Sequence, residues 1–289
     1  MDHAIQERVR DCFSLLNDPP SQLIYSGQVY YNITGDYTYI AKMLRTLFLQ
    51  HRSCIRSDKL TDAFTHCLDD LDQLRPLKRF VVDHDYIFFD PSVVRLGEEE
   101  VFIDCGAMDM STSLEFAYRT KDSYKRIVAL EPDPICQEIC QDNLVFFSRK
   151  KRDCVCLLDC GAADVDGTLP FRRSVEPGGS CIVERSEENI PVKKIDDIPE
   201  CADATFIKIH IEGRELEALK GARETIARER PTVAVSCYHN LEELLTVPVL
   251  LKQLCPDYRL YMRHYSTGTS ESVLYAVPPE RDATDSLDA

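Results

Sequence analysis

Two hydrophobic patterns divide the chain near residue 98. Before this point, apolar residues recur at helical spacing over residues 5–16, 21–32, 37–49 and 60–71. After it, short apolar runs alternate with helical segments, and the runs cover residues 101–105, 126–130, 154–158, 205–211 and 232–238. Strand–helix alternation predicts a doubly wound α/β fold, in which a mostly parallel sheet has helices on both faces. We therefore expect an N-terminal helical cap with an extended arm over residues 1–98 and a sheet domain over residues 99–278.

Local signals refine the ends of these elements. Ser21 is expected to cap the second helix, Pro134 to open the helix after the second run, and Asn240 with Glu243 to form a capping box. A single helix is expected over residues 214–229, and a small extra strand over residues 168–172. Two β-rich runs joined by Ser-Thr-Gly-Thr-Ser, 258–265 and 271–277, predict a hairpin that makes the last strand antiparallel. Residues 279–289 are expected to be a disordered tail.

Composition narrows the class of protein. The 289 residues carry a formal net charge of −15, and 44% of them are hydrophobic, which is typical of a folded globular chain. Strong acidity argues against nucleic acid and anionic membranes as partners, because both require a positive field. No apolar run approaches the roughly 18 residues of a membrane helix, and the N-terminus lacks the apolar core of a signal peptide. We expect a cytoplasmic protein that acts on a neutral or cationic small molecule; its oligomeric state stays open.

Cysteine usage agrees with a reducing compartment. The chain holds 13 cysteines, which we interpret as reduced thiols. Cys154, Cys156 and Cys160 lie close together, but no second pair stands at zinc-ligand spacing, so buried thiols are favoured over a metal site. The basic run at residues 148–152 is interpreted as a solvated loop.

The chemistry is expected beyond the carboxyl ends of the parallel strands, where open α/β sheets bind ligands. The first run ends in Asp104, Cys105, Gly106 and Ala107, and the adjacent run ends in Glu131 followed by Pro132. A carboxylate at the position of Glu131 can accept hydrogen bonds from both hydroxyls of a ribose. Only one glycine stands in the first turn, so the G-x-G-x-x-G cradle for a pyrophosphate is absent. The pattern favours S-adenosylmethionine over a nicotinamide dinucleotide.

Six segments together resemble the FkbM family of S-adenosylmethionine-dependent methyltransferases, over roughly residues 85–278. They are VFIDCGA at 101–107, ALEPDP at 129–134, PVKKIDDI at 191–198, FIKIHIEGRELEALKGA at 206–222, VSCYHNLEEL at 235–244 and YRLYMRHYS at 258–266. The resemblance implies the class I methyltransferase (Rossmann-like) fold, with seven strands of which the last is antiparallel. It also implies methyl transfer to a hydroxyl of a sugar or another small molecule. In such a protein the turn at Asp104–Ala107 and Glu131 would hold the cofactor, and Asp159 and Ala162 would lie near the adenine.

Two positions depart from the family pattern. Its first motif usually reads D-x-G-x-x-x-G, and here Met110 stands in the last place. Its fourth-strand motif usually reads F-I-K-I-D-x-E-G, and here His210 replaces the acid. These departures keep open a second hypothesis, a binding or regulatory protein on a degenerate methyltransferase scaffold. A nicotinamide-dependent oxidoreductase is a third, which the missing glycines disfavour.

Methyl transfer to oxygen requires a group that takes the hydroxyl proton. His239 is the first candidate, because it ends the fifth run and a histidine titrates near neutral pH. His210 and His264 are further candidates, and Lys208 either orients the acceptor, anchors Glu212 or forms a structural ion pair. Acceptor contacts are expected from Glu212, Tyr238 and Arg263. A divalent metal held by His210, Glu212 and His239 is an alternative that no spacing demands, and we predict none.

Overall fold

The computed structural model describes residues 3–50, 87–174 and 179–284, without the side chains of residues 48–50. The helix expected over residues 60–71 and the first residues of the expected arm lie outside this part of the chain. Contacts between residues divide the protein into two compact units. Unit 1 draws on Met1–Val94, Ser236–Gln253 and Asp257–Ala289, and unit 2 on Arg95–Val235 and Leu254–Pro256. The division expected from sequence, with its first boundary at residue 98, stays a prediction.

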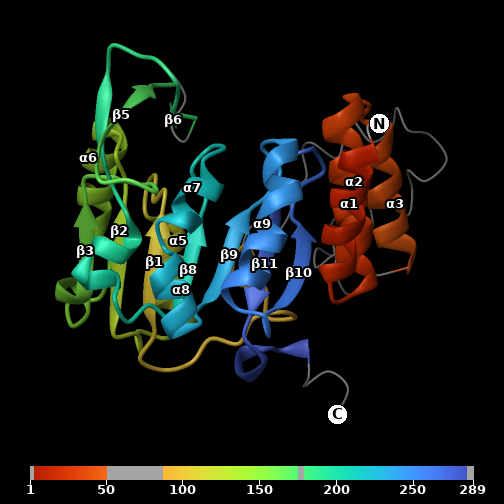
Figure 1. The fold of residues 1–289 in the computed structure, drawn as a ribbon. Coiled ribbons are helices and arrows are strands. Elements are labelled where there is room, and N and C mark those ends of the chain that lie inside the picture. The colour runs from red at the N-terminus through yellow and green to blue at the C-terminus, as the bar shows by residue number, and fades with distance from the viewer. Residues whose placement is uncertain (1–2, 51–86, 175–178, 285–289) are drawn as a thin grey trace. The chain divides into compact units, whose positions relative to one another are not determined.

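The main sheet has seven strands, which confirms the expected α/β fold class (Figure 1). The strands are β1 (Val101–Cys105), β2 (Arg126–Leu130), β3 (Val155–Leu158), β8 (Phe206–Ile209), β9 (Thr232–Ser236), β10 (Arg259–His264) and β11 (Ser272–Val277). Their order is β10-β11-β9-β8-β1-β2-β3. Neighbours from β9 to β3 pair in parallel, whereas β10 and β11 pair antiparallel as predicted.

Unit 2 contains the five parallel strands with their connecting helices. These helices are α5 (Ser111–Arg119), α6 (Pro134–Asn143), α7 (Glu215–Lys220) and α8 (Arg223–Glu229). Pro134 opens α6 as predicted, and the Asp133 carboxylate caps it by accepting from the Ile135 N–H. The single helix expected over residues 214–229 is wrong, because the chain breaks at Gly221. A Cβ at that glycine would lie 1.9 Å from the Ala163 carbonyl oxygen, so the break allows two backbones to touch.

A second, four-stranded sheet also belongs to unit 2. It consists of β4 (Gly161–Ala162), β5 (Gly167–Arg172), β6 (Cys181–Ile182) and β7 (Asn189–Lys193), in the order β4-β7-β5-β6. Only β5 was predicted from the sequence. Strands β4 and β6 have two residues each and carry no periodicity, whereas β7 alternates exposed and buried residues over five positions and was missed. The sheet buries a small core of its own, made by Ala163, Phe171, Ile190 and Val192.

Unit 1 contains α1 (His3–Leu15), α2 (Pro19–Thr34), α3 (Thr38–Gln50), α9 (Leu241–Leu254) and the β10–β11 hairpin. The three N-terminal helices match the predicted pattern, but Ser21 does not cap α2. Asp18 takes that place and accepts from the Ser21 N–H at 2.9 Å, with Pro19 and Pro20 in the first turn. The Asn240 side chain caps α9 as predicted, by accepting from the Glu243 N–H.

Helix α2 packs on the hairpin through buried polar contacts. The Arg263 guanidinium donates to Asp18 Oδ2 at 2.7 Å, and the Ser21 hydroxyl accepts from the Met262 N–H at 2.8 Å. The expected disordered tail is wrong for residues 279–284. They form a 3-10 turn (Pro279–Arg281) and bury Asp282, 1% exposed, which accepts from Arg259 at 2.9 Å and from the Tyr261 hydroxyl at 2.7 Å. Two partners from β10 therefore hold the C-terminal segment.

No helix in the described part of the chain is both long and apolar enough to cross a bilayer.

Candidate active site

A cavity lies in unit 2, where the parallel strands β1, β2, β3 and β8 end. Its lining comes from the segments that follow these strands and from the second sheet. The lining residues are Gly106, Met108, Glu131, Pro132, Asp133, Cys136, Gly161, Ala162, Phe171, Ser180, Cys181, Ile182, His210, Ile211 and Glu212. The cavity is therefore where open α/β sheets bind ligands, as the sequence predicted.

The turn after β1 is held by backbone contacts on both sides. Gly106 has φ +80°, and a Cβ there would lie 2.0 Å from the His210 carbonyl oxygen. The Gly106 and Ala107 N–H groups both donate to the Leu130 carbonyl. Glycine is therefore required for the close approach of the segment after β8, and Gly106 itself lines the cavity.

Asp104 and Cys105, which were expected to hold a cofactor, are buried beneath this turn. Asp104 is 0% exposed and accepts from the Lys208 ammonium at 2.8 Å and from the Ser113 hydroxyl at 2.7 Å. Burial raises the pKa of the Cys105 thiol well above its usual range. Neither side chain lines the cavity, nor does Ala107. A cofactor contact by these three residues stays a prediction.

Lys208 has a structural role in this arrangement. Its ammonium group also donates to the Gly106 carbonyl at 2.7 Å, so one cation fixes both β1 and the turn that follows. The sequence left three roles open for Lys208, and its ammonium group forms an ion pair with Asp104. An ion pair at this depth persists because each charge compensates the other in a poorly solvated place.

Glu131 occupies the predicted position at the end of β2 and lines the cavity. Its two carboxylate oxygens accept from the Met108 N–H at 2.8 Å and from the Asp133 N–H at 2.9 Å. The side chain is 6% exposed, and burial raises the pKa of its carboxyl, with the two backbone donors acting in the opposite direction. Each carboxylate oxygen has a second lone pair, so the group retains capacity for further hydroxyl donors.

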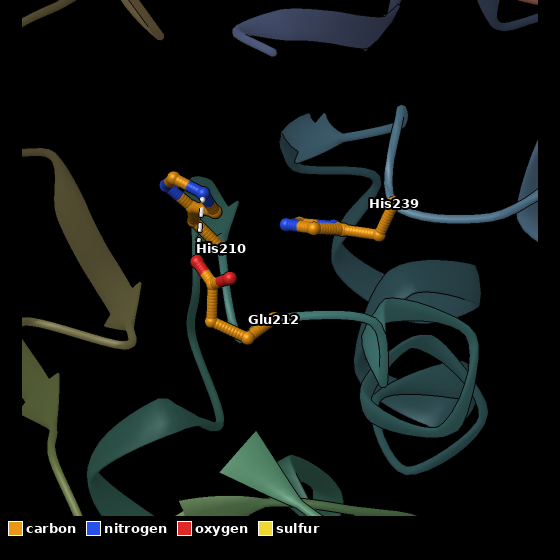
Figure 2. Close-up of side chains that lie close together, drawn as sticks. All are labelled: His210, Glu212 and His239. Atoms are coloured by element: carbon orange, nitrogen blue, oxygen red, sulfur yellow. Dashed lines mark ion pairs between the residues drawn. The ribbon is translucent and has the colours of Figure 1, made fainter. Parts of the chain in front are cut away.

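His210 and Glu212 face the cavity from the segment after β8. His210 Nε2 lies 3.4 Å from Glu212 Oε1 (Figure 2). Glu212 has a left-handed backbone, with φ +61°. The buried carboxylate of Glu215 accepts from the N–H groups of the two residues that flank Glu212, Ile211 and Gly213, both at 2.9 Å. Glu215 thus fixes the conformation that presents Glu212, a role that the sequence analysis missed.

Other lining residues of the cavity are largely apolar. Ala162, which was expected near an adenine, lines the cavity next to Gly161, whereas Asp159 is exposed and does not line it. The second sheet adds Phe171, Cys181 and Ile182. These three escaped the sequence analysis because only tertiary pairing brings β5 and β6 to the ends of the main strands.

The remaining predicted residues belong to unit 1. His239 is also labelled in Figure 2; its Nδ1 lies 3.9 Å from Glu243 Oε2, and its ring lies against that of Tyr238 at 4.1 Å between centroids. In the hairpin, the His264 Nδ1 lies 2.8 Å from the Ser272 hydroxyl, and Arg263 is buried in its pair with Asp18. Arg263 and His264 therefore have partners within unit 1, and the substrate contact expected of Arg263 stays a prediction.

Met110 does not fill the cavity. It is 0% exposed, precedes α5 with φ +63°, and is absent from the cavity lining. The family pattern has glycine here, and the left-handed backbone gives the physical reason, since glycine adopts it without cost. Met110 instead places its side chain in the core.

The cysteines expected as buried thiols are only partly so. Cys160 is buried, whereas Cys154 and Cys156 are partly exposed, and the described cysteines are all free thiols.

Comparisons with known proteins give this geometry its context. The family model of the methyltransferase FkbM domain matches residues 104–266. A crystal structure of methyltransferase FkbM from Methylobacillus flagellatus matches 94% of this chain at 24% identity, with a TM-score of 0.65. A precorrin-6y C5,15-methyltransferase from Geobacter metallireducens matches 64% of this chain and 83% of its own at 18% identity, with a TM-score of 0.42. Comparison with curated proteins gave no match.

The chain spans 58% of the length of the Methylobacillus protein, so that likeness concerns the fold. The family model, in contrast, covers more than half of this chain and includes the segments that line the cavity. Because fold, motif order and family model agree, the chain belongs to the FkbM methyltransferase family.

Proposed function

We propose that this protein transfers the methyl group of S-adenosylmethionine to a hydroxyl oxygen of a small molecule, such as a sugar or a related natural product. The observation that carries the proposal is the Glu131 carboxylate in the wall of a cavity at the carboxyl ends of β1, β2, β3 and β8. Methyl transfer is the reaction of the family, and the hydroxyl acceptor is our inference from the resemblance.

The residues present fit an adenosyl group. Glu131 offers its remaining lone pairs to the two ribose hydroxyls, and the small residues Gly161 and Ala162 leave room for a flat base. Phe171 and Ile182 provide an apolar surface on the same side. The turn after β1 has a single glycine, Gly106, and so lacks the G-x-G-x-x-G cradle for a pyrophosphate, which an adenosyl sulfonium ligand does not need.

S-adenosylmethionine, when bound, supplies a methyl group on a positively charged sulfur. The protein then has to align the acceptor oxygen and accept its proton. His210 is placed for the proton because it lines the cavity, and Glu212 beside it stabilises the imidazolium that forms. Glu215 holds this pair in position through the two backbone N–H groups. His239, the first candidate from sequence, stays a prediction to be tested beside it.

Calorimetry with S-adenosylhomocysteine tests the cofactor part of the proposal. We expect saturable binding and no binding of NADH. Absence of heat at millimolar S-adenosylhomocysteine would favour the alternative, a degenerate scaffold that binds something else.

Methyl transfer from radiolabelled S-adenosylmethionine to a panel of hydroxyl compounds tests the reaction. With an acceptor found, His210→Gln is expected to reduce turnover by about 10²–10⁴-fold, the range for loss of a general base, with S-adenosylhomocysteine affinity retained. A normal rate in His210→Gln together with a large loss in His239→Ala would move the role to His239.

The place of action is proposed on composition. The cysteines that the structure describes are free thiols, which suits the cytoplasm. The net charge of −15 suits a neutral or cationic small-molecule acceptor rather than nucleic acid or an anionic membrane.

A further inference from the structure

Part of the cavity wall comes from two strands that are not in the main sheet. Strands β5 and β6 pair antiparallel, with Phe171 opposite Ile182 and Arg172 opposite Cys181. Their described residues, 167–174 and 179–183, form the β5–β6 arm, which is a different segment from the extended arm expected before β1. In this subsection "the arm" means the β5–β6 arm. Figure 1 shows β5 and β6 beyond one end of β2 and β3. The arm contributes Phe171, Ser180, Cys181 and Ile182 to the cavity, so its position determines the shape of this wall.

One hydroxyl ties the arm to the helix side of the cavity. Ser180 Oγ donates to Asp133 Oδ2 at 2.7 Å and accepts from the Ser174 N–H at 3.0 Å. The Ser180 hydroxyl therefore links Ser174, which follows β5, to Asp133, which lies 47 positions before Ser180 in the chain.

The acceptor of this hydrogen bond is itself fixed. Asp133 is 4% exposed, and its other oxygen, Oδ1, accepts from the Ile135 N–H at 3.0 Å as the cap of α6. Its own N–H donates to Glu131 Oε1 at 2.9 Å. A short chain of hydrogen bonds thus runs from the ribose-binding carboxylate proposed above to the strand that carries Cys181 and Ile182.

We propose that Ser180 is a positioning residue for the nucleoside ligand. Ser180 holds the apolar wall of the arm against the base, while Glu131 holds the ribose. The inference rests on the proposed function, because it takes an adenosyl ligand to be the occupant of this cavity. Ser180 is assigned no contact with the reacting atoms.

Loss of the hydroxyl separates the arm from α6 without emptying a core site, because Ser180 is only partly buried. An untethered arm has to be ordered when the ligand binds, and that ordering reduces the affinity. The base is the part of the ligand next to the arm, so the effect follows the base and not the amino-acid end.

The test compares Ser180→Ala with Ser180→Thr, which keeps the hydroxyl. Ser186→Ala is the matched control, because Ser186 is exposed and accepts from the Glu188 N–H at 3.2 Å away from the cavity. Stopped-flow release of S-adenosylhomocysteine is expected to be about tenfold faster in Ser180→Ala, in keeping with loss of one hydrogen bond to a charged group. Ser180→Thr and Ser186→Ala should release it at the wild-type rate.

Two further measurements separate positioning from a general loss of structure. The Ser180→Ala variant should lose the same affinity for adenosine as for S-adenosylhomocysteine and no affinity for methionine. The thermal midpoint of its ligand-free form should stay within a few degrees of wild type. Amide exchange at Val183, whose N–H donates to the Pro170 carbonyl, should become faster in Ser180→Ala alone.

The inference would be overturned if Ser180→Ala released S-adenosylhomocysteine at the wild-type rate, or if Ser186→Ala released it equally fast. A loss of affinity for methionine in Ser180→Ala would also overturn it. Failure of the wild type to bind S-adenosylhomocysteine at all would overturn the proposed function and this inference with it. Binding by the wild type with no difference among the variants would overturn the role of Ser180 alone.

Discussion

The strand ends of unit 2 and the β10–β11 hairpin of unit 1 carry similar side chains with different surroundings. Each has a histidine close to a cation in sequence, His210 near Lys208 in one and His264 beside Arg263 in the other. His210 lines a cavity next to Glu212, whereas His264 lies against Ser272 and Arg263 is buried against Asp18. Residue type alone therefore does not show whether a histidine or a cation lines a cavity or makes a structural contact in the fold.

The difference comes from what the distant chain provides. In the hairpin, α2 supplies Asp18 and Ser21, which satisfy the polar groups of β10. At the end of β8 the chain turns at Glu212, whose φ is +61°, and the segment that follows the strand lines a cavity. Unit 2 contains both kinds of surroundings, a buried ion pair and a cavity wall. Lys208 donates to the buried Asp104, and Ile211, three residues after Lys208 in the chain, lines the cavity.

The largest effect is expected from Lys208→Met. Asp104 is 0% exposed, so the variant leaves an uncompensated buried carboxylate and should lose about 3–5 kcal/mol of unfolding free energy. Denaturant unfolding measures the loss.

Arg263→Met is the matched variant in unit 1. Asp18 keeps 23% side-chain exposure and its own serine donor, so it can be solvated, and a smaller loss is expected. Equal losses of unfolding free energy would show that the two ion pairs are equally shielded from solvent.

The next largest effect is expected from Gly106→Ala. Its left-handed backbone costs about 1 kcal/mol for alanine, and the clash of Cβ with the His210 carbonyl adds to this, for a total of about 2–4 kcal/mol. Gly35 in unit 1 has φ +69° with nothing within 4 Å of its Cβ position, so Gly35→Ala should lose only the backbone share. Thermal unfolding of the two variants gives the comparison, which fails if Gly35→Ala is the more destabilised.

Glu131→Ala should weaken S-adenosylhomocysteine binding by about 1.5–3 kcal/mol, the value of hydrogen bonds to a charged group. Calorimetry measures the change, and Asp159→Ala is the control, because Asp159 is exposed and outside the cavity lining. Unchanged affinity in Glu131→Ala would mean that the ribose lies elsewhere.

The same carboxylate predicts how binding depends on pH. Burial raises the pKa of Glu131 above its ordinary value of 4.5, and the ionised form is the one that accepts from ribose hydroxyls. Affinity should therefore be constant at neutral pH and fall as the pH drops toward that raised pKa. Glu131→Gln should bind weakly at every pH, without this decline.

The smallest effect concerns the stability of unit 1. Burial of the His264 ring lowers its pKa from 6.5 to about 4. Between these values the unfolded chain takes up a proton that the folded chain does not, so stability falls as the pH drops from about 6.5 toward 4. Unfolding free energies at pH 7.5 and 5 should differ more in wild type than in His264→Gln. An identical difference in the two proteins would contradict the assignment of this slope to His264.

The strongest sequence predictions depended on local periodicity and on motif order. The apolar runs that became β1, β2, β8 and β9 could be found because a buried parallel strand reads as a continuous apolar stretch. Glu131 could be placed because it directly follows such a strand. The short strands β4 and β6 and the break at Gly221 could not, since two residues show no period and a close backbone contact leaves no sequence pattern.

The amino-acid sequence by itself determined the family, the alternation of strands and helices and the edge of the sheet where the cavity lies, because these follow from local composition and chain order. Only the tertiary structure decided which polar groups are free for chemistry. Asp104, Lys208 and Arg263 are occupied by partners 104 to 245 residues away, and Ser180 reaches the cavity through a contact across 47 residues. Burial and hydrogen bonding between distant segments are properties of packing, and packing decides whether a polar side chain has a partner or faces a cavity.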